Sequence, residues 1–255
     1  MTKIIKLLGC SLLIAATSFF QSCKDDDGYS IGDIGVDWVT VHVEGDGYYS
    51  FIGDSWGTMW PAATSIWNYK PVEGERAILY FNPLYDNYQG FDHAIKSESI
   101  YPILTKQVEQ LTSENESEFA DDPAYITDAW VSGGYMNIVF VQRLPQEHAH
   151  KVSLVENLTS EPEDDGYVHL EYRYNTYGDS LSAMPLVSGA VSYNLNTLDL
   201  ENANGIKLRI NSAVNGERVI VFEKNSKSQP NGVDNIDISS MKVQSYLYDI
   251  LLPYI

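Results

Sequence analysis

One cysteine near the start of the chain has the neighbours of a residue that accepts a lipid. Two lysines precede an apolar stretch from residue 7 to residue 20, and Ser22 stands directly before Cys23. A short apolar stretch behind a basic start is typical of a secretory signal peptide, and this stretch is too short to span a bilayer comfortably. We therefore predict that residues 1–22 are removed and that the Cys23 thiol is acylated.

A charged segment follows this cysteine at once, made of Lys24, Asp25, Asp26 and Asp27. It resembles the lysine-plus-acid export tag of Bacteroidetes surface lipoproteins. The resemblance implies an outer-membrane lipoprotein, exposed at the cell surface and held by its N-terminal lipid. The alternative is that residues 4–20 form an ordinary hydrophobic element, which fits less well with the acidic, glycine-containing tether that follows. The only other cysteine, Cys10, lies in the predicted signal, so the mature chain needs a core that is stable without disulfides.

The charge of the chain restricts its partners. With 16 basic and 35 acidic residues, the net charge is −19. Such a surface repels nucleic acid and anionic lipid headgroups, so we predict no nucleic-acid binding. Strong negative charge suits either simple solubility in a solvent-facing protein or attraction of a basic protein partner.

Histidines and acids give two metal-site hypotheses. His148 and His150 alternate, and with Glu147 and His169 they could supply zinc ligands from one face of a strand. The preceding proline, however, favours a loop, where exposed histidines are common. The acidic stretch 161–166 lacks the alternating acids and downstream glutamate of a calcium-binding EF-hand loop. We therefore predict no metal site and no cofactor.

Motifs for catalysis are missing from the sequence. It contains no Gly-x-Ser-x-Gly elbow, no His-Glu-x-x-His helix and no free cysteine in the predicted mature chain. Glu171 and Arg173 are two positions apart, which places them on one face of a strand as a structural ion pair. We predict that the protein is not an enzyme.

Tryptophans gather in the first third of the chain. We expect Trp38, together with Phe51, to fill a hydrophobic core. Trp56, Trp60 and Trp67 fall in a less regular stretch, where a large aromatic side chain has less structural reason to occur. They are our candidate ligand-binding residues, for a glycan or a protein surface, although a small barrel also needs large side chains for its core.

The elements that position these residues are almost all strands. Apolar and polar residues alternate over short segments separated by glycine, asparagine, aspartate and proline. The first domain has five predicted strands, too few for an ordinary sandwich and suited to a small closed barrel, at residues 38–43, 48–52, 76–81, 91–96 and 101–105. We place the acidic tether at 23–35 and this barrel at 36–106.

A second domain begins after a polar stretch. We predict a linker at residues 107–122 with one short helix around 106–111. Seven further strands argue for an antiparallel β-sandwich over 123–224, at residues 125–131, 135–144, 152–156, 167–174, 189–195, 206–211 and 218–222. Residues 225–255 form a C-terminal extension, which we expect to pack on the sandwich rather than bind a partner. The fold class is all-β, a small barrel followed by a sandwich.

Several phrases in this order resemble the NigD-like lipoproteins of Bacteroidetes. They begin with the lipidation region, Cys23 to Asp33, and continue with 74–76, 103–106, 128–137, 170–179 and 191–193. The resemblance implies an oligonucleotide/oligosaccharide-binding (OB) type barrel followed by a β-sandwich. The family takes its name from a bacteriocin operon, in which its member was proposed to act in immunity, and it offers no catalytic residues to carry over.

Two features depart from the family pattern. Tyr172 and Tyr174 stand where phenylalanine and histidine are expected, and the stretch after Asn225 is longer than usual. On this basis we predict a non-catalytic binding module of the envelope, similar to an immunity protein and with a basic, toxin-like partner. The alternative is a lipoprotein that binds glycans through the tryptophan-rich barrel.

Overall fold

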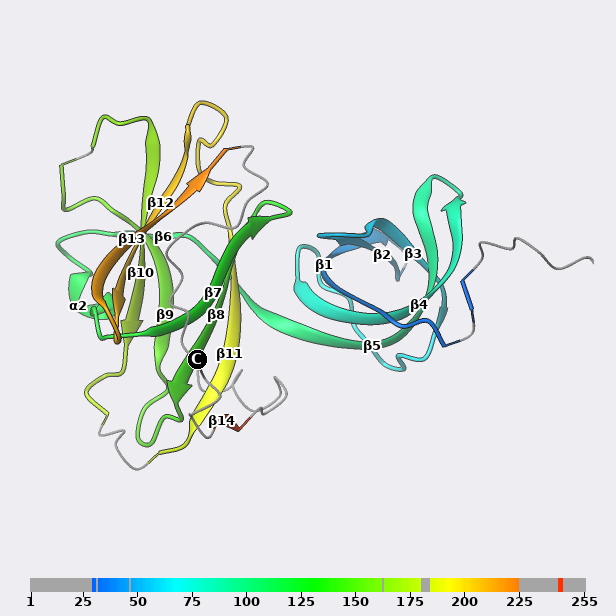
Figure 1. Ribbon diagram of the computed structural model, residues 1–255, viewed down its shortest axis with the longest axis horizontal. Helices are drawn as coiled ribbons and strands as arrows, with labels where there is room; N and C mark the ends of the chain where they lie inside the picture. The colour runs from blue at the N-terminus through cyan, green and yellow to red at the C-terminus, as the bar shows by residue number, and fades with distance from the viewer. Residues whose placement is uncertain are drawn as a thin grey trace, which may run out of the picture.

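The chain forms two β-rich domains that share one long strand (Figure 1). The computed structural model describes residues 29–30, 32–45, 47–161, 163–179, 184–224 and 243–244. Cys23 and the predicted tag at residues 24–27 lie outside the described residues. Within the described part, no helix has the length and apolar character needed to cross a membrane.

The first domain is a closed five-stranded barrel. Its strands are β1 (Gly35–Gly45), β2 (Tyr48–Gly53), β3 (Gly57–Thr64), β4 (Arg76–Tyr88) and β5 (Phe91–Gln107). They pair in the order β3-β2-β1-β4-β5, and a parallel β3–β5 pairing closes the ring. Alternation in β1 turns Val39 and Val41 inward, where they meet Phe51 and Leu79 in the core. The predicted barrel is thereby confirmed.

Two details of the barrel differ from expectation. The segments predicted as separate strands at 91–96 and 101–105 are one strand, β5, because Ser97, Ser99 and Ile100 between them continue the pairing with β4, with a bulge at Glu98. The fifth barrel strand is instead β3, which the sequence pattern hid because Pro61 and two alanines interrupt its alternation.

The second domain is a sandwich of two sheets. One sheet continues from β5 through β11 (Leu186–Asn194) and β8 (Tyr135–Arg143) to β7 (Tyr125–Ser132). The other has the order β13-β12-β10-β9-β6, with bounds Gly216–Glu223, Gly205–Ser212, Tyr167–Asn175, Lys151–Asn157 and Glu109–Leu111. The seven predicted strands are confirmed, although the pairs β10–β12 and β6–β9 are parallel. The core lies between the sheets.

The stretch between the domains is more regular than expected. The predicted helix at 106–111 is wrong, because β5 runs through Gln107 and β6 follows it as an edge strand beside β9. The helix lies later, at α2 (Glu116–Phe119), where Phe119 packs with Leu111 and Val155.

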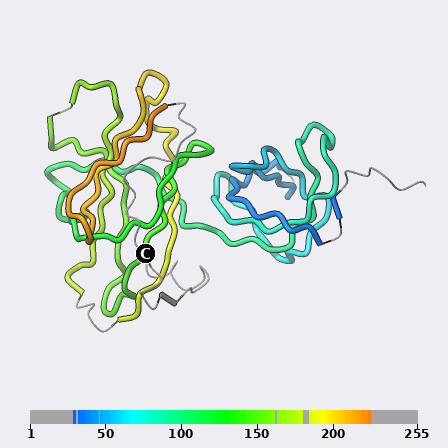
Figure 2. Tube along the Cα trace, in the orientation of Figure 1, coloured from blue at the N-terminus to red at the C-terminus, as the bar shows by residue number. Residues whose placement is uncertain are grey.

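β5 is the structural connection between the two domains. Its first part pairs with β4 and β3, and residues 104–107 pair in parallel with β11 of the sandwich. The continuous path from barrel to sandwich is visible in the tube view (Figure 2). Past residue 224, only β14 (Val243–Gln244) is described, and it pairs with β11. The rest of the C-terminal extension lies outside the described residues.

Candidate functional site

A buried arginine sits where the two domains meet. Arg76, at the start of β4, is fully buried, and its guanidinium donates two hydrogen bonds to the Asp54 carboxylate at 2.9 and 2.7 Å. The same group donates to Thr40 Oγ1 at 3.1 Å in the barrel and to Asn137 Oδ1 at 3.3 Å in the sandwich. A paired and hydrogen-bonded arginine is the form in which a buried charge is tolerated.

Residues of the sandwich also make hydrogen bonds and ring contacts to the barrel at this junction. Ser132 Oγ donates to Asp54 Oδ2 at 2.5 Å, and the Tyr135 hydroxyl donates to the Gly74 carbonyl at 2.9 Å. Trp38 meets Trp130 edge to face, with ring centroids 4.7 Å apart. Trp38 therefore lies at the domain junction, half-buried, and its expected place in the barrel core is wrong, whereas Phe51 is confirmed there.

Two of the sequence segments that resemble the known family meet at this junction. Arg76 ends the phrase 74–76, and Trp130, Gly133, Tyr135 and Asn137 belong to the phrase 128–137, so residues 61 positions apart meet in one cluster. Gly133 has a φ of +57°, and a Cβ there would lie 3.3 Å from Asp54 Oδ1. The cluster connects the barrel to the sandwich through side-chain contacts.

The three candidate tryptophans have different environments. Trp56 packs edge to face on Phe81, 5.0 Å away in the barrel core. Trp60 lies on the outer face of β3, with Phe91 at 5.3 Å and Tyr48 at 6.4 Å. Trp67 is 80% exposed. Within the described residues, no ring contact joins any two of the three tryptophans, and their role in binding stays a prediction.

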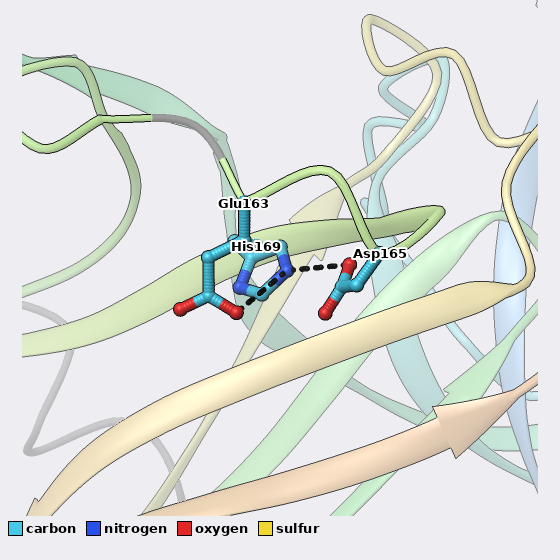
Figure 3. Close-up of side chains that lie close together, drawn as sticks. All are labelled: Glu163, Asp165 and His169. Atoms are coloured by element: carbon cyan, nitrogen blue, oxygen red, sulfur yellow. Dashed lines mark hydrogen bonds and ion pairs between the residues drawn. The ribbon is translucent and has the colours of Figure 1, made fainter.

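The histidines proposed as zinc ligands belong to separate clusters. His148 is exposed in the loop before β9, while His150 is buried against Tyr174 and Asp179. His169 contacts Asp165 at 3.0 Å and Glu163 at 3.8 Å (Figure 3). His169 and Tyr174 are five positions apart on β10, roughly 16 Å along a strand, so His150 and His169 cannot share an ion.

The acid–histidine cluster in Figure 3 already has a cation. Lys207, whose side chain is not drawn in Figure 3, has its Nζ 2.5 Å from Asp165 Oδ2, and this ammonium group, followed by His169, holds the pKa of Asp165 well below its usual range. Glu163, Asp165 and His169 lie close enough together to be ligands, but Lys207 supplies the charge that a metal ion would bring. We read the cluster as an ion-pair network at the edge of β10 and β12.

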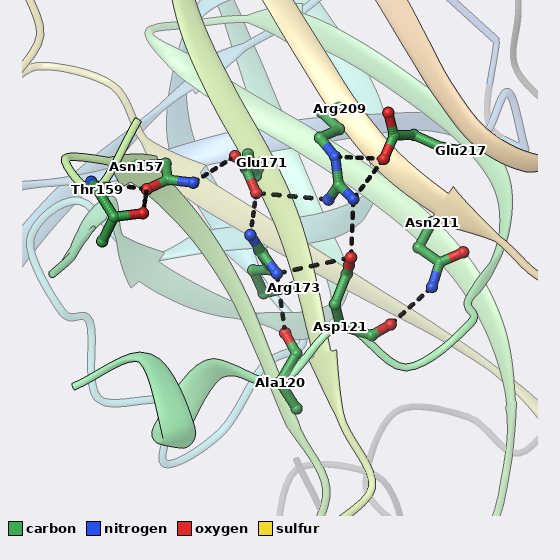
Figure 4. Close-up of polar contacts among 9 residues, drawn as sticks. All are labelled: Ala120, Asp121, Asn157, Thr159, Glu171, Arg173, Arg209, Asn211 and Glu217. Atoms are coloured by element: carbon green, nitrogen blue, oxygen red, sulfur yellow. Dashed lines mark hydrogen bonds and ion pairs between the residues drawn. The ribbon is translucent and has the colours of Figure 1, made fainter. Parts of the chain in front are cut away.

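A second charged network covers the outer face of the β10–β12 sheet (Figure 4). The predicted ion pair between Glu171 and Arg173 is confirmed. Arg209 extends it, with contacts to Asp121 at 2.8 Å and Glu217 at 2.6 Å. Alternating charges of this kind stabilise a partly buried sheet face, and here the two arginines offset two of the three carboxylates.

A pocket of about 320 Å³ opens at one end of the sandwich. Its walls come from the start of β7, the end of β8 and the end of β10, with Phe140 and Tyr172 buried inside. Asp122 and Arg143 line its less buried part. The size is at the lower end of the range for small-molecule sites.

Gln142 is the unusual residue of this pocket. The core-facing row of β8 is Met136, Ile138 and Phe140, and alternation places Gln142 next in that row. Its side chain is 4% exposed, and neither its nitrogen nor its oxygen has a hydrogen-bond partner. Sequence reasoning missed it, although a glutamine at an inward-facing strand position is a signal that the alternation alone could have shown.

Behind the pocket wall, Tyr174 belongs to a buried hydrogen-bonded chain. Its hydroxyl lies 2.6 Å from His150 Nδ1, and His150 Nε2 lies 3.3 Å from the Asp179 carboxylate. Because a carboxylate only accepts, Nε2 carries the proton, and the neutral ring accepts from the tyrosine. Burial lowers the pKa of His150, against the opposing effect of Asp179 and Asp122. Burial and then Asp122 raise the pKa of Tyr174.

This arrangement predicts a loss of stability in mild acid. A histidine with a lowered pKa binds fewer protons folded than unfolded, so the free energy of unfolding should fall as pH drops below about 6.5. The slope contributed by His150 is at most about 1.4 kcal/mol per pH unit. Urea unfolding of the chain and of His150→Gln between pH 7 and 5 measures it, and the variant should show the shallower slope.

His42→Gln is the matched control for this measurement. His42 is half-exposed and its pKa is raised, chiefly by Glu73, so its contribution is complete below about pH 6.5 and is lost only as pH rises above it. It should leave the slope between pH 6.5 and 5 unchanged. Equal slopes in the chain and in His150→Gln would contradict a neutral, buried His150.

Comparisons with known proteins agree with this architecture. Residues 38–103 match the family model described as NigD-like N-terminal OB domain, and residues 107–224 match the NigD-like C-terminal beta sandwich domain. A solved structure from Parabacteroides distasonis, named only provisionally as toxin-related, is 30% identical, with a TM-score of 0.63. That match covers 76% of this chain and 95% of the other.

Two further solved structures share the fold. A protein of unknown function from Bacteroides vulgatus is 24% identical, with a TM-score of 0.69 over 82% of this chain and all of its own. A NigD-like immunity protein from Bacteroides caccae is 18% identical, with a TM-score of 0.56 over 74% of this chain and 93% of its own. A search of curated proteins found no match.

Proposed function

Because this chain belongs to the NigD-like family, we propose that it is a non-catalytic binding protein of the cell envelope that acts as an immunity protein does. The observation that carries the proposal is the match of both domains to the family, one structural neighbour of which is described as an immunity protein. The partner we propose is a basic, toxin-like protein, which a net charge of −19 would attract.

The hydrogen-bonded junction supports a binding role. A recognition surface that is already held in place loses less entropy when a partner binds. The Arg76–Asp54 pair and its contacts to Ser132 and Asn137 join the two domains through side-chain hydrogen bonds. In the described residues we find hydrogen-bonded and ion-paired clusters, and each has a structural explanation that does not require catalysis.

The membrane anchor is part of the proposal. Acylation at Cys23 would hold the protein in the outer membrane, and the segment Lys24–Asp27 would direct it to the cell surface. An immunity-like protein at that place meets a toxin before the toxin reaches its target. Glycan binding through Trp56, Trp60 and Trp67 is less favoured, because Trp56 is partly buried and packs against Phe81 of the barrel core.

A crosslinking experiment in the host tests the proposed partner. Intact cells carrying the full-length chain are treated with a crosslinker while exposed to medium from toxin-producing neighbours, and captured proteins are identified. We expect one dominant basic protein, captured several-fold less at about 0.5 M salt than at about 0.05 M, because salt screens exposed charges. Survival in the same medium should fall when the gene is deleted.

Two controls separate the parts of this proposal. Cys23→Ala should abolish surface capture and protection, because the exported chain is no longer anchored. Trp67→Ala changes an exposed aromatic residue without touching the junction, and it distinguishes an aromatic contact from a purely electrostatic one. Capture of glycan without protein, or unchanged survival of the deletion strain, would contradict the immunity-like role.

A further inference from the structure

The sandwich pocket contains a polar group for which the fold supplies no partner. Gln142 is 4% exposed, and both its Nε2 and its Oε1 lack hydrogen bonds within the protein. Leaving a buried polar group unpaired costs about 1–3 kcal/mol, so a core position of this kind normally carries an apolar residue. Val187, which pairs with Gln142 on the neighbouring strand β11, is a buried apolar residue of this usual kind.

The walls around Gln142 are shaped for an apolar body. Phe140, Tyr172 and Tyr174 present buried rings to the pocket, and Ala124 adds a small side chain that leaves room. The Tyr174 hydroxyl is already engaged with His150, so it does not compete for Gln142. The pocket therefore combines apolar walls with one unpaired amide, whose nitrogen and oxygen are covered by surrounding atoms, so the Gln142 side chain must turn toward the pocket to reach a ligand.

The outer part of the pocket favours a neutral occupant. Asp122 and Arg143 both line it, one acidic and one basic. Each is already engaged: Asp122 accepts from the Thr176 backbone N–H at 2.8 Å and hydroxyl at 2.6 Å, and Arg143 donates to the Met184 carbonyl at 2.6 Å. These partners are neutral, but the two charges are opposite and sum to zero, so the outer part as a whole favours neither an anionic nor a cationic ligand.

We infer that this pocket binds a small neutral molecule that has an aromatic or branched aliphatic body and a carboxamide edge. An amide edge donates and accepts side by side, which matches the unpaired acceptor and donors of Gln142 once its side chain turns toward the ligand. The body fills the space beside Phe140 and Tyr172. This site lies in the sandwich, away from the tryptophans of the barrel, and the inference does not rest on the immunity-like function.

Three probes of one shape test the inference on the unmodified full-length chain. Benzamide has the amide edge, acetophenone replaces its NH₂ with a methyl group, and benzoate only accepts hydrogen bonds. The readout is the NMR signal of the Gln142 side-chain amide, assigned by its absence from Gln142→Leu. We expect benzamide to bind with a dissociation constant of about 1 mM, as suits so small a ligand.

The relative affinities of the three probes decide whether the inference holds. Acetophenone and benzoate should bind about tenfold or more weakly than benzamide, because each leaves Gln142 Oε1 unpaired. In Gln142→Leu the preference for benzamide over acetophenone should disappear. Gln146→Leu makes the same chemical change at an exposed position four residues later and should leave all three affinities unchanged.

The comparison of the three probes needs no variant, so it stands even if Gln142→Leu folds poorly. Equal binding of all three, or no shift of the Gln142 amide by benzamide at about ten times the expected dissociation constant, would overturn the inference.

Discussion

Replacing Arg76 with methionine is expected to lower the free energy of unfolding by about 3–5 kcal/mol, the usual cost of removing one partner of a buried ion pair. Methionine keeps much of the length of the side chain but leaves the Asp54 carboxylate, only 12% exposed, without its guanidinium. The contacts with Thr40 and Asn137 are lost as well. Urea unfolding followed by tryptophan fluorescence measures the change.

The loss should also uncouple the two domains. Trp38 and Tyr135 lie beside the guanidinium, at 5.9 and 5.2 Å, so the fluorescence of the junction should respond before that of the rest of the chain. The double variant with Asp54→Leu should recover part of the loss, because no unpaired charge remains. Lys96→Met removes a partly exposed ion pair with Glu98 and should cost less than about 1 kcal/mol. A similar small effect at Arg76 would show that the junction is not a clamp.

Replacing Gly205 with alanine is expected to cost about 3 kcal/mol or more. Gly205 begins β12 with a φ of +155°, and a Cβ there would lie 2.0 Å from the backbone oxygen of Phe222 in β13. A backbone atom cannot turn aside as a side chain can, so the two strands must separate where Gly205 pairs with Glu223. Thermal or urea unfolding gives the change in stability.

Gly216→Ala is the control for the backbone conformation alone. Gly216 has a φ of +71° and nothing within 4 Å of the position of a Cβ. Its replacement should cost about 1 kcal/mol, the price of a left-handed conformation in alanine. If the two variants were equally stable, the close approach of β12 and β13 at Gly205 would be refuted.

The strands were predictable because their signal is local. Alternation placed β1, β2 and all seven strands from β7 to β13 near their observed positions, since every second side chain of a strand faces the same way. β3 escaped notice because Pro61 breaks its pattern, and its strand character depends on pairing with β5, more than 30 positions later. The predicted helix failed for a similar reason, since β6 is a strand only because β9 lies beside it.

Site residues were harder to predict than strands. The pairing of Glu171 with Arg173 followed from their spacing on one strand. The burial and hydrogen bonding of His150 could not be predicted in this way, because its partners Tyr174 and Asp179 lie 24 and 29 positions away. Trp38 was assigned to the barrel core because nothing in the sequence shows that Trp130 covers it from the other domain.

The sequence alone determined the all-β class, the order of barrel and sandwich, and the family, because alternation, turn residues and short phrases are properties of neighbouring residues. Only the tertiary structure decided that Arg76 is a buried clamp and that Gln142 faces an apolar pocket without a partner. Both depend on which distant strands pack together. The burial of a charge or an amide, and hence its energetic cost, exists only once that packing is complete.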